Sequence, residues 1–161
     1  MDALLDFELL SLLAVANGVP LFAKRFFGEA ANRALDGGAR WRGKPVFGPS
    51  KTIRGIATAF VATPVVALLL GLPALIGLIV ALGAMAGDLI SSFVKRRLGM
   101  PSSSQAPGLD QIPESLLPAL LVTLVLPITA LDIIVTVLAF MIFEVVLSRI
   151  LFQIGFRDQP Y

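Results

Sequence analysis

The chain has 161 residues, of which 57% are hydrophobic and only 15% charged, with a formal net charge of +2 and a mean hydropathy of +0.88. Soluble domains are about 45–50% apolar and about 25% charged, so this composition excludes an ordinary soluble protein. The chain contains neither Cys nor His, which excludes disulfides, thiol chemistry, imidazole base catalysis and His-ligated zinc. Any bound metal must be held by oxygen, which favours Mg²⁺, Mn²⁺ or Ca²⁺.

Five long apolar stretches predict five membrane-crossing helices. A crossing helix needs about 20 mostly apolar residues, and the candidates lie at residues 4–23, 55–71, 73–94, 115–131 and 133–152. Together they occupy most of the chain and leave no room for a separate soluble domain. We therefore expect an all-α integral membrane protein that forms one embedded domain over residues 1–161.

The basic residues alternate between the gaps and tails of this pattern. All 13 fall in the first gap, the third gap and the C-terminal end, which includes Arg157, whereas the N-terminal end is acidic from Asp2 onward. Under the positive-inside rule, this alternation places the N-terminus outside and the C-terminus in the cytoplasm. The two polar loops, at about 25–54 and 98–113, then meet at the cytoplasmic face of the cell membrane.

The first apolar stretch contains the polar segment Asn17-Gly18-Val19-Pro20. Pro20 removes a backbone donor, so we expect the helix to be interrupted there. Such a break survives at membrane depth only where it faces protein or a water-filled cavity. Two interpretations stay open: a packing kink in which Asn17 binds the freed backbone, and a substrate-binding role for Asn17.

The loop at residues 25–54 is rich in Gly and basic residues, and Gly lets backbone N–H groups approach an anion closely. It ends in Ser50, Lys51 and Thr52, just before the second helix. Ser50 or Thr52 can cap that helix, whose dipole favours a phosphate. The alternative is a basic loop that binds anionic lipid headgroups. Further phosphate-binding candidates in the loop are Arg42, Lys44 and Arg54.

The third apolar stretch carries Asp88, about two turns inside its basic end. An acidic group at membrane depth is costly and is a functional candidate by default. Residues 88, 91, 92 and 95 share one helix face, which offers a carboxylate, the hydroxyls of Ser91 and Ser92, and the Lys95 ammonium. Carboxylate and hydroxyl suit a metal ion, and Lys suits a phosphate. The alternative is an internal pairing of Asp88 with Lys95 or Arg96.

The loop at 98–113 is short, rich in Ser, Gly and Pro, and contains Asp110 near its end. Asp110 either caps the fourth helix or shares a cation with Asp88. Glu114 follows in the first turn of that helix, where a carboxylate suits the helix dipole. Glu144 lies inside the fifth apolar stretch, where it either pairs with a cation of the first loop or bonds another helix.

The residue types present in the chain limit the reactions that it can catalyse. Hydrolysis by a Ser–His pair or a zinc site is excluded, whereas phosphoryl or nucleotidyl transfer depends mainly on positioning, metal ions and cations that neutralise phosphate charge. A phosphate nucleophile is already anionic at neutral pH and needs no protein base. A site at a membrane face suits a lipid phosphate.

One motif is rejected. The segment Asp36-Gly37-Gly38-Ala39-Arg40 resembles the start of the CDP-alcohol phosphatidyltransferase motif, but the spacing between Gly37 and Ala39 is one residue short. No further Asp occurs before Asp88, so the remaining acids of that motif are missing.

A different family matches better. The chain resembles the CDP-diglyceride synthetase (phosphatidate cytidylyltransferase) superfamily, whose signature runs S-x3-D-x4-K-R, K-D-x-G, P-G-H-G-G and a terminal D-R. The elements in corresponding order are Gly87-Asp88, Lys95-Arg96, Pro107-Gly108 and Leu109-Asp110-Gln111. The segment from Pro49 to Thr52 with Gly55 is similar to the family's S-P-K-K-T-x-E-G.

The departures from this signature point to one branch. The K-D step reads Met100-Pro101, the His-Gly-Gly is missing, and the final Arg is Gln111. The chain resembles the archaeal branch, the CDP-archaeol synthases, in these losses and in its small size. It also resembles that branch in the segments Asn17–Pro20 and Lys51–Gly55.

The resemblance implies that CTP and 2,3-bis-O-geranylgeranylglycerol phosphate react, with Mg²⁺, to give a CDP-activated ether lipid and pyrophosphate. It implies metal binding by Asp88 and Asp110, and catalytic roles for these two with Lys51 and Lys95. The expected partners are CTP, an isoprenoid ether-lipid phosphate and membrane lipid, with no nucleic acid. The substrate-binding candidates are Asn17, Arg42, Lys44, Ser50, Thr52, Arg54, Ser92 and Arg96.

Two other functions stay open at this point. The same cytidylyl transfer onto diacyl phosphatidic acid uses the same headgroup chemistry, because the two lipids differ mainly in their tails. A non-enzymatic ion or phosphate transporter would use Asp88 and Glu144 as a path, but it needs polar groups near the midplane. No internal repeat supports that class.

Overall fold

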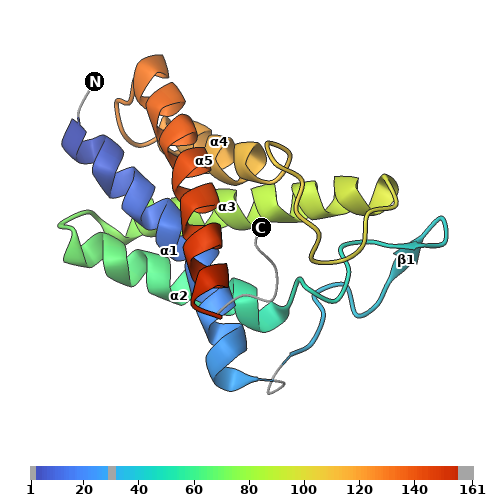
Figure 1. The fold of residues 1–161 in the computed structure, drawn as a ribbon. Coiled ribbons are helices and arrows are strands. Elements are labelled where there is room, and N and C mark those ends of the chain that lie inside the picture. Colours follow the sequence, from blue (N-terminus) through green and yellow to red (C-terminus); the bar gives the residue numbers. More distant parts are fainter. Residues whose placement is uncertain (1–2, 29–31, 156–161) are drawn as a thin grey trace.

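The computed structural model describes residues 3–28 and 32–155, so Asp2 and Arg157 of the charge pattern lie outside the described residues. The described chain is α-helical apart from one small hairpin (Figure 1), as expected. The helices are α1 (Ala3–Phe27), α2 (Ile53–Leu69), α3 (Ala74–Arg97), α4 (Gln111–Val122) and α5 (Ala130–Gln153). The hairpin pairs β1 (Arg40–Trp41) with β2 (Lys44–Pro45) in the loop between α1 and α2.

Three of these helices are long and apolar enough to cross a membrane: α1, α3 and α5, with 25, 24 and 24 residues. At about 1.5 Å per residue, each exceeds the roughly 30 Å hydrocarbon core. α2 has 17 residues and α4 only 12, so α4 is about 18 Å long. Where five full-length spans were expected, the described chain thus has three long helices and two shorter apolar ones.

The fourth helix differs most from its predicted range of 115–131. It begins at Gln111 and ends at Val122, and residues 123–129 form turns and irregular chain. The reason lies in the start of α5, where Thr129 and Asp132 form a reciprocal capping box. Such a box fixes a helix start, and Pro127 cannot donate to a continuing helix before it.

The predicted interruption of the first helix is wrong. α1 continues through Pro20 to Phe27, and Asn17 Nδ2 donates to the Leu13 carbonyl oxygen at 3.0 Å. Asn17 thus bonds its own helix backbone, and its substrate-binding role stays a prediction. Pro20 packs against the first turn of α2, because a Cβ placed on Gly55 would lie 3.4 Å from the Pro20 Cβ.

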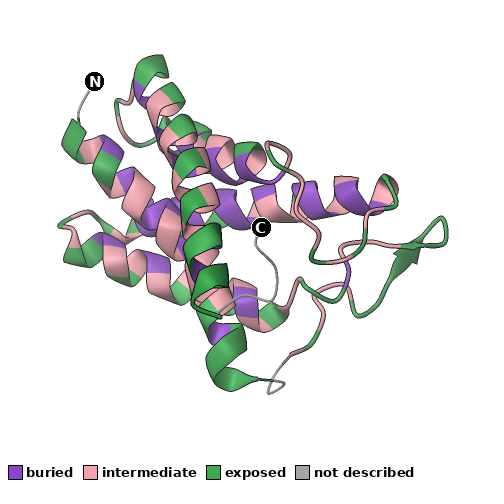
Figure 2. Cartoon of the chain, in the orientation of Figure 1, coloured by how far each residue is buried: buried purple, intermediate pink, exposed green. Residues whose placement is uncertain are grey.

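α3 occupies the centre of the fold and packs against α1, α2 and α4. Within the most apolar 18-residue stretch of α3, 50% is buried, whereas only 17% of the corresponding stretch of α5 is buried. Figure 2 shows this contrast along the two helices. Two glycines of α3 bring neighbouring backbones into contact. A Cβ on Gly83 would lie 2.5 Å from the Pro118 Cα, and one on Gly87 would collide with the Pro113 carbonyl group.

The apolar core changes in character along α3. Away from the loops it is built from large side chains, including Leu12, Val80 and Phe140. Closer to Asp88 it consists mainly of small ones, with Ala16 and Ala84 in a cluster that also contains Ala59 and Met85. Small side chains let the helix backbones pack closely around this part of α3.

We expect Gly87→Ala to separate α3 from α4, because the added methyl group collides with the backbone at Pro113 and Glu114. Overpacking of this kind costs about 1–3 kcal/mol, so the melting temperature in detergent should fall. Gly18→Ala in α1 is the matched control, since a Cβ there meets nothing within 4 Å. Equal melting temperatures for the two variants would contradict the close approach.

Candidate active site

The first ion pair joins the loop between α1 and α2 to α3. Lys51 Nζ lies 2.5 Å from Asp88 Oδ1, and both side chains are 22% exposed. Thr52, the next residue, caps α2, with its side chain accepting from the Gly55 N–H at 3.1 Å. The cap fixes the start of α2 and thereby holds Lys51 over α3.

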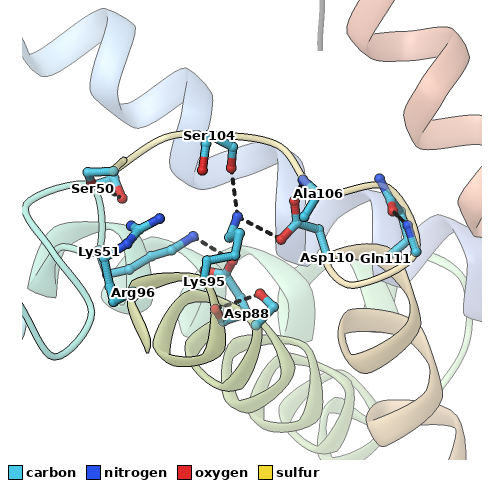
Figure 3. Close-up of polar contacts among 12 residues, drawn as sticks. Ser50, Lys51, Asp88, Lys95, Arg96, Ser104, Ala106, Asp110 and Gln111 are labelled. Carbon is cyan, nitrogen blue, oxygen red and sulfur yellow. Dashed lines mark hydrogen bonds and ion pairs between the residues drawn. The ribbon is translucent and has the colours of Figure 1, made fainter. Parts of the chain in front are cut away.

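The second ion pair joins α3 to the loop before α4. Lys95 Nζ lies 2.6 Å from Asp110 Oδ1, and both side chains are 9% exposed. Figure 3 shows Lys95 between this carboxylate and the Ser104 carbonyl oxygen, to which it donates at 2.8 Å. The other oxygen of Asp110 accepts the Ala106 N–H at 2.8 Å. This pair therefore has additional contacts on each side.

The pairing corrects two of the alternatives drawn from the sequence. Asp88 does not pair within α3 with Lys95 or Arg96; each of the two acids binds a lysine from a different segment. Asp110 stands at the N-cap position of α4 but makes no side-chain capping bond. The helix-capping explanation of Asp110 is therefore wrong.

Lys51 faces more than one carboxylate. Burial by itself lowers the pKa of Lys51, but attraction to Asp88, Glu114 and Asp110 outweighs it, so the pKa is raised above its usual value. The side chain is therefore a charged ammonium throughout the physiological range. The two ion pairs lie within electrostatic reach of each other, as Figure 3 also shows.

Glu114 is the site residue that the sequence reasoning missed. The sequence alone assigns it to the helix dipole, but it is buried, 6% exposed, and lies within electrostatic range of Lys51. Its backbone touches α3 at Gly87, next to Asp88. The signal was the four-residue spacing from Asp110 to Glu114, which places both acids on one helix face. Glu144 of α5 lies within electrostatic range of Glu114.

The rejected motif at Asp36 has a structural role. Asp36 accepts N–H bonds from Gly38 at 2.9 Å, Phe47 at 2.9 Å and Gly48 at 3.1 Å. Its slight burial raises the pKa of the carboxyl, but these backbone bonds outweigh that effect and the net pKa is lowered. Asp36 thus closes the hairpin loop onto itself.

The hairpin is docked on the end of α3. Arg97 donates to the carbonyl oxygens of Trp41 and Pro45, and Lys44 Nζ donates back to the Arg97 carbonyl oxygen at 2.8 Å. The Trp41 ring stacks on Phe93, with centroids 5.4 Å apart and planes at 20°. These contacts give the basic loop a defined position beside the ion pairs.

A cavity of about 270 Å³ lies between the hairpin and the loop that follows α3. Arg96 lines it and donates to the carbonyl oxygens of Pro101, at 2.7 Å, and Phe47, at 3.4 Å. Ser102 Oγ donates to Ser50 Oγ at 3.1 Å across the same region. The lining residues are Lys44, Pro45, Arg96, Gly99, Met100, Pro101 and Ser102.

Three other predicted substrate-binding residues are Ser92, Arg42 and Arg54, and their positions differ relative to the two ion pairs. Ser92 is buried in α3, 1% exposed. Arg42 lies over the Trp41 ring on the hairpin, 5.4 Å from its centroid. Arg54 donates to the Gly28 carbonyl oxygen at 2.8 Å, which ties α2 to the end of α1. Arg42 and Arg54 thus make their described contacts outside the ion-paired centre.

Residues 13–161 match the CarS-like family, described as CDP-archaeol synthase. The chain belongs to this family. A CDP-archaeol synthase of Hyperthermus butylicus is 40% identical over 114 residues, covering 63% of this chain and 65% of that protein. One of Thermococcus onnurineus is 39% identical over 92 residues, covering 50% and 54%. The matched part thus spans between half and two thirds of the length of these two CDP-archaeol synthases.

A solved structure agrees with this assignment. It is described as an intramembrane enzyme for archaeal membrane lipids biosynthesis, and it matches with a TM-score of 0.67 and 30% identity over 85% of this chain and 90% of that one. The resemblance found in the sequence is confirmed at the level of the CDP-archaeol synthase family. The chain is accordingly a multi-pass membrane protein.

We expect Asp36→Ala to loosen the hairpin, because three backbone N–H groups lose their acceptor. Brief trypsin treatment at neutral pH should then cleave after Arg40 or Arg42 faster than in the unaltered protein. Since the carboxyl has a lowered pKa, its contribution is present above about pH 3.8 and is lost only as the pH falls further. Asp36→Asn keeps one acceptor oxygen and should show a smaller effect. Equal cleavage rates in all three proteins would contradict this role.

Proposed function

We propose that this chain transfers the cytidylyl group of CTP to 2,3-bis-O-geranylgeranylglycerol phosphate, giving unsaturated CDP-archaeol and pyrophosphate. The observation that carries the proposal is the double ion pair of Lys51 with Asp88 and Lys95 with Asp110 beside a basic cavity. It supplies carboxylates for a metal and cations for phosphates. Membership of the CDP-archaeol synthase family supports the choice of nucleotide and lipid.

The donor set fits Mg²⁺. Asp88 and Asp110 provide the carboxylate oxygens that Mg²⁺ prefers, and Mg²⁺ commonly uses one or two carboxylates together with substrate phosphates. When bound, the ion would neutralise charge that builds up on the transferring phosphate.

In this proposal the protein's own side chains position two phosphates and neutralise their charge. Lys51 and Lys95 bind the triphosphate of CTP, with Arg96, Lys44 and Ser50 at the cavity contributing further donors. The lipid phosphate attacks the α-phosphorus of CTP as an anion, so no protein base takes part. The new bond joins a lipid phosphate oxygen to the α-phosphorus, and pyrophosphate leaves.

The lipid side of the site follows from its place at one end of α3. The exposed apolar surfaces of the long helices face the hydrocarbon region, so the isoprenoid tails lie among lipid tails while the phosphate reaches Asp88 and Lys51. We propose that this end faces the cytoplasm, where CTP is available, in agreement with the charge pattern.

We expect Asp88→Asn to abolish turnover. In detergent with Mg²⁺, radiolabelled CTP and geranylgeranyl ether-lipid phosphate, labelled lipid should fall by about 100-fold or more, the loss typical for a missing electrostatic contact to a transition state. The control Glu8→Gln, near the opposite end of α1, should keep full activity. Turnover at the unaltered rate in Asp88→Asn would refute the metal role, and labelling of diacyl phosphatidic acid alone would refute the lipid assignment.

A single Cys tests the orientation, because the chain has no native Cys. With Ser103→Cys, a membrane-impermeant maleimide should label the protein only after cells are opened, since this loop is proposed to be cytoplasmic. Ala3→Cys at the start of α1 should be labelled in intact cells. The reverse pattern would invert the proposed topology.

A further inference from the structure

Lys51 occupies the carboxylate that the proposed function assigns to the metal. Its ammonium lies 2.5 Å from Asp88 Oδ1, about the distance at which the same oxygen would also have to accept a dication. An ammonium and a divalent cation on one carboxylate oxygen repel each other strongly at this separation. A metal bound at Oδ1 would therefore compete with Lys51 for that oxygen.

The two ion pairs differ in how firmly they are held. Lys95 also donates to the Ser104 carbonyl oxygen, and Asp110 also accepts the Ala106 N–H, so that pair is fixed on both sides. The Lys51–Asp88 pair is more exposed, 22% compared with 9%. Lys51 lies beside Ser50, whose hydroxyl borders the cavity through Ser102. The Lys51–Asp88 pair is thus the more exposed of the two, and Lys51 is the sequence neighbour of a serine that contacts the cavity wall.

We propose that Lys51 is an exchangeable counter-ion, which Asp88 releases when a divalent cation binds and which then binds a phosphate of the nucleotide. The inference rests on the proposed function for the metal role of Asp88. Metal and nucleotide should therefore bind cooperatively. A metal on Asp88 frees Lys51 for the nucleotide, and a nucleotide phosphate on Lys51 frees Asp88 for the metal.

A double-mutant cycle tests the exchange through binding alone. CTP is titrated calorimetrically into detergent-purified protein, with EDTA or with Mg²⁺ and without lipid, for the unaltered chain, Lys51→Met, Asp88→Asn and the double variant. In EDTA, the double variant should bind CTP within about twofold of the unaltered chain, because Lys51 and Asp88 neutralise each other there and both are removed together. Lys51→Met in the Asp88→Asn background, or with Mg²⁺ in the unaltered background, should weaken CTP binding by about fivefold or more.

Lys44→Met is the matched control. Lys44 lines the same cavity but donates to the Arg97 carbonyl oxygen rather than to a carboxylate. Its removal should therefore change CTP affinity by the same factor with and without Mg²⁺. If Lys51→Met does not fold, Lys51→Gln gives the same comparison.

The outcomes separate the two proposals. A double variant that binds CTP about fivefold or more weakly than the unaltered chain in EDTA, or a Lys51→Met variant without effect in Mg²⁺, would overturn the exchange and leave the enzymatic function intact. Failure of the unaltered protein to bind CTP even with Mg²⁺ would instead contradict the proposed function itself.

Discussion

Four charged side chains at one end of a membrane helix set the main constraint on this fold. Asp88 and Lys95 belong to α3, and at such a depth neither charge is tolerated without a partner. The partners come from the two loops, Lys51 from one and Asp110 from the other. Because each pair joins α3 to a different loop, balancing the charges of α3 also assembles the site.

This arrangement requires that the loops approach α3 closely, and the helices are built accordingly. Gly87, next to Asp88, lets the backbone at Pro113 touch α3, and this contact carries Glu114 and Asp110 toward the site. The short α4 follows from the same geometry, since its first turn is fixed at Gly87 and the chain must turn back at Thr129 to begin α5. Packing and charge pairing thus act on the same turn of α4.

The sequence predicted the helical class, the two polar loops and the four paired residues, because each leaves a local signal such as a charge inside an apolar run. The partners within the pairs were not predictable, since they depend on how loops far apart in sequence return to α3. The continuity of α1 through Pro20 also depends on tertiary contacts, here those with Gly55 of α2. The early end of α4 was different: Thr129 and Asp132 have the spacing of a capping box, and that signal was overlooked.

The basic residues divide into two groups by chemistry. Arg96 and Arg97 spread several donors over backbone carbonyl oxygens, including those of Pro101 and Trp41, and so fasten both loops to the end of α3. A guanidinium suits this task because its donors are fixed in one plane, whereas an ammonium is a compact charge on a flexible stem. Lys51 needs only one partner at a time, and a phosphate serves it as well as a carboxylate does. In the proposed exchange, the arginines keep the loops in place while Lys51 moves from Asp88 to a phosphate.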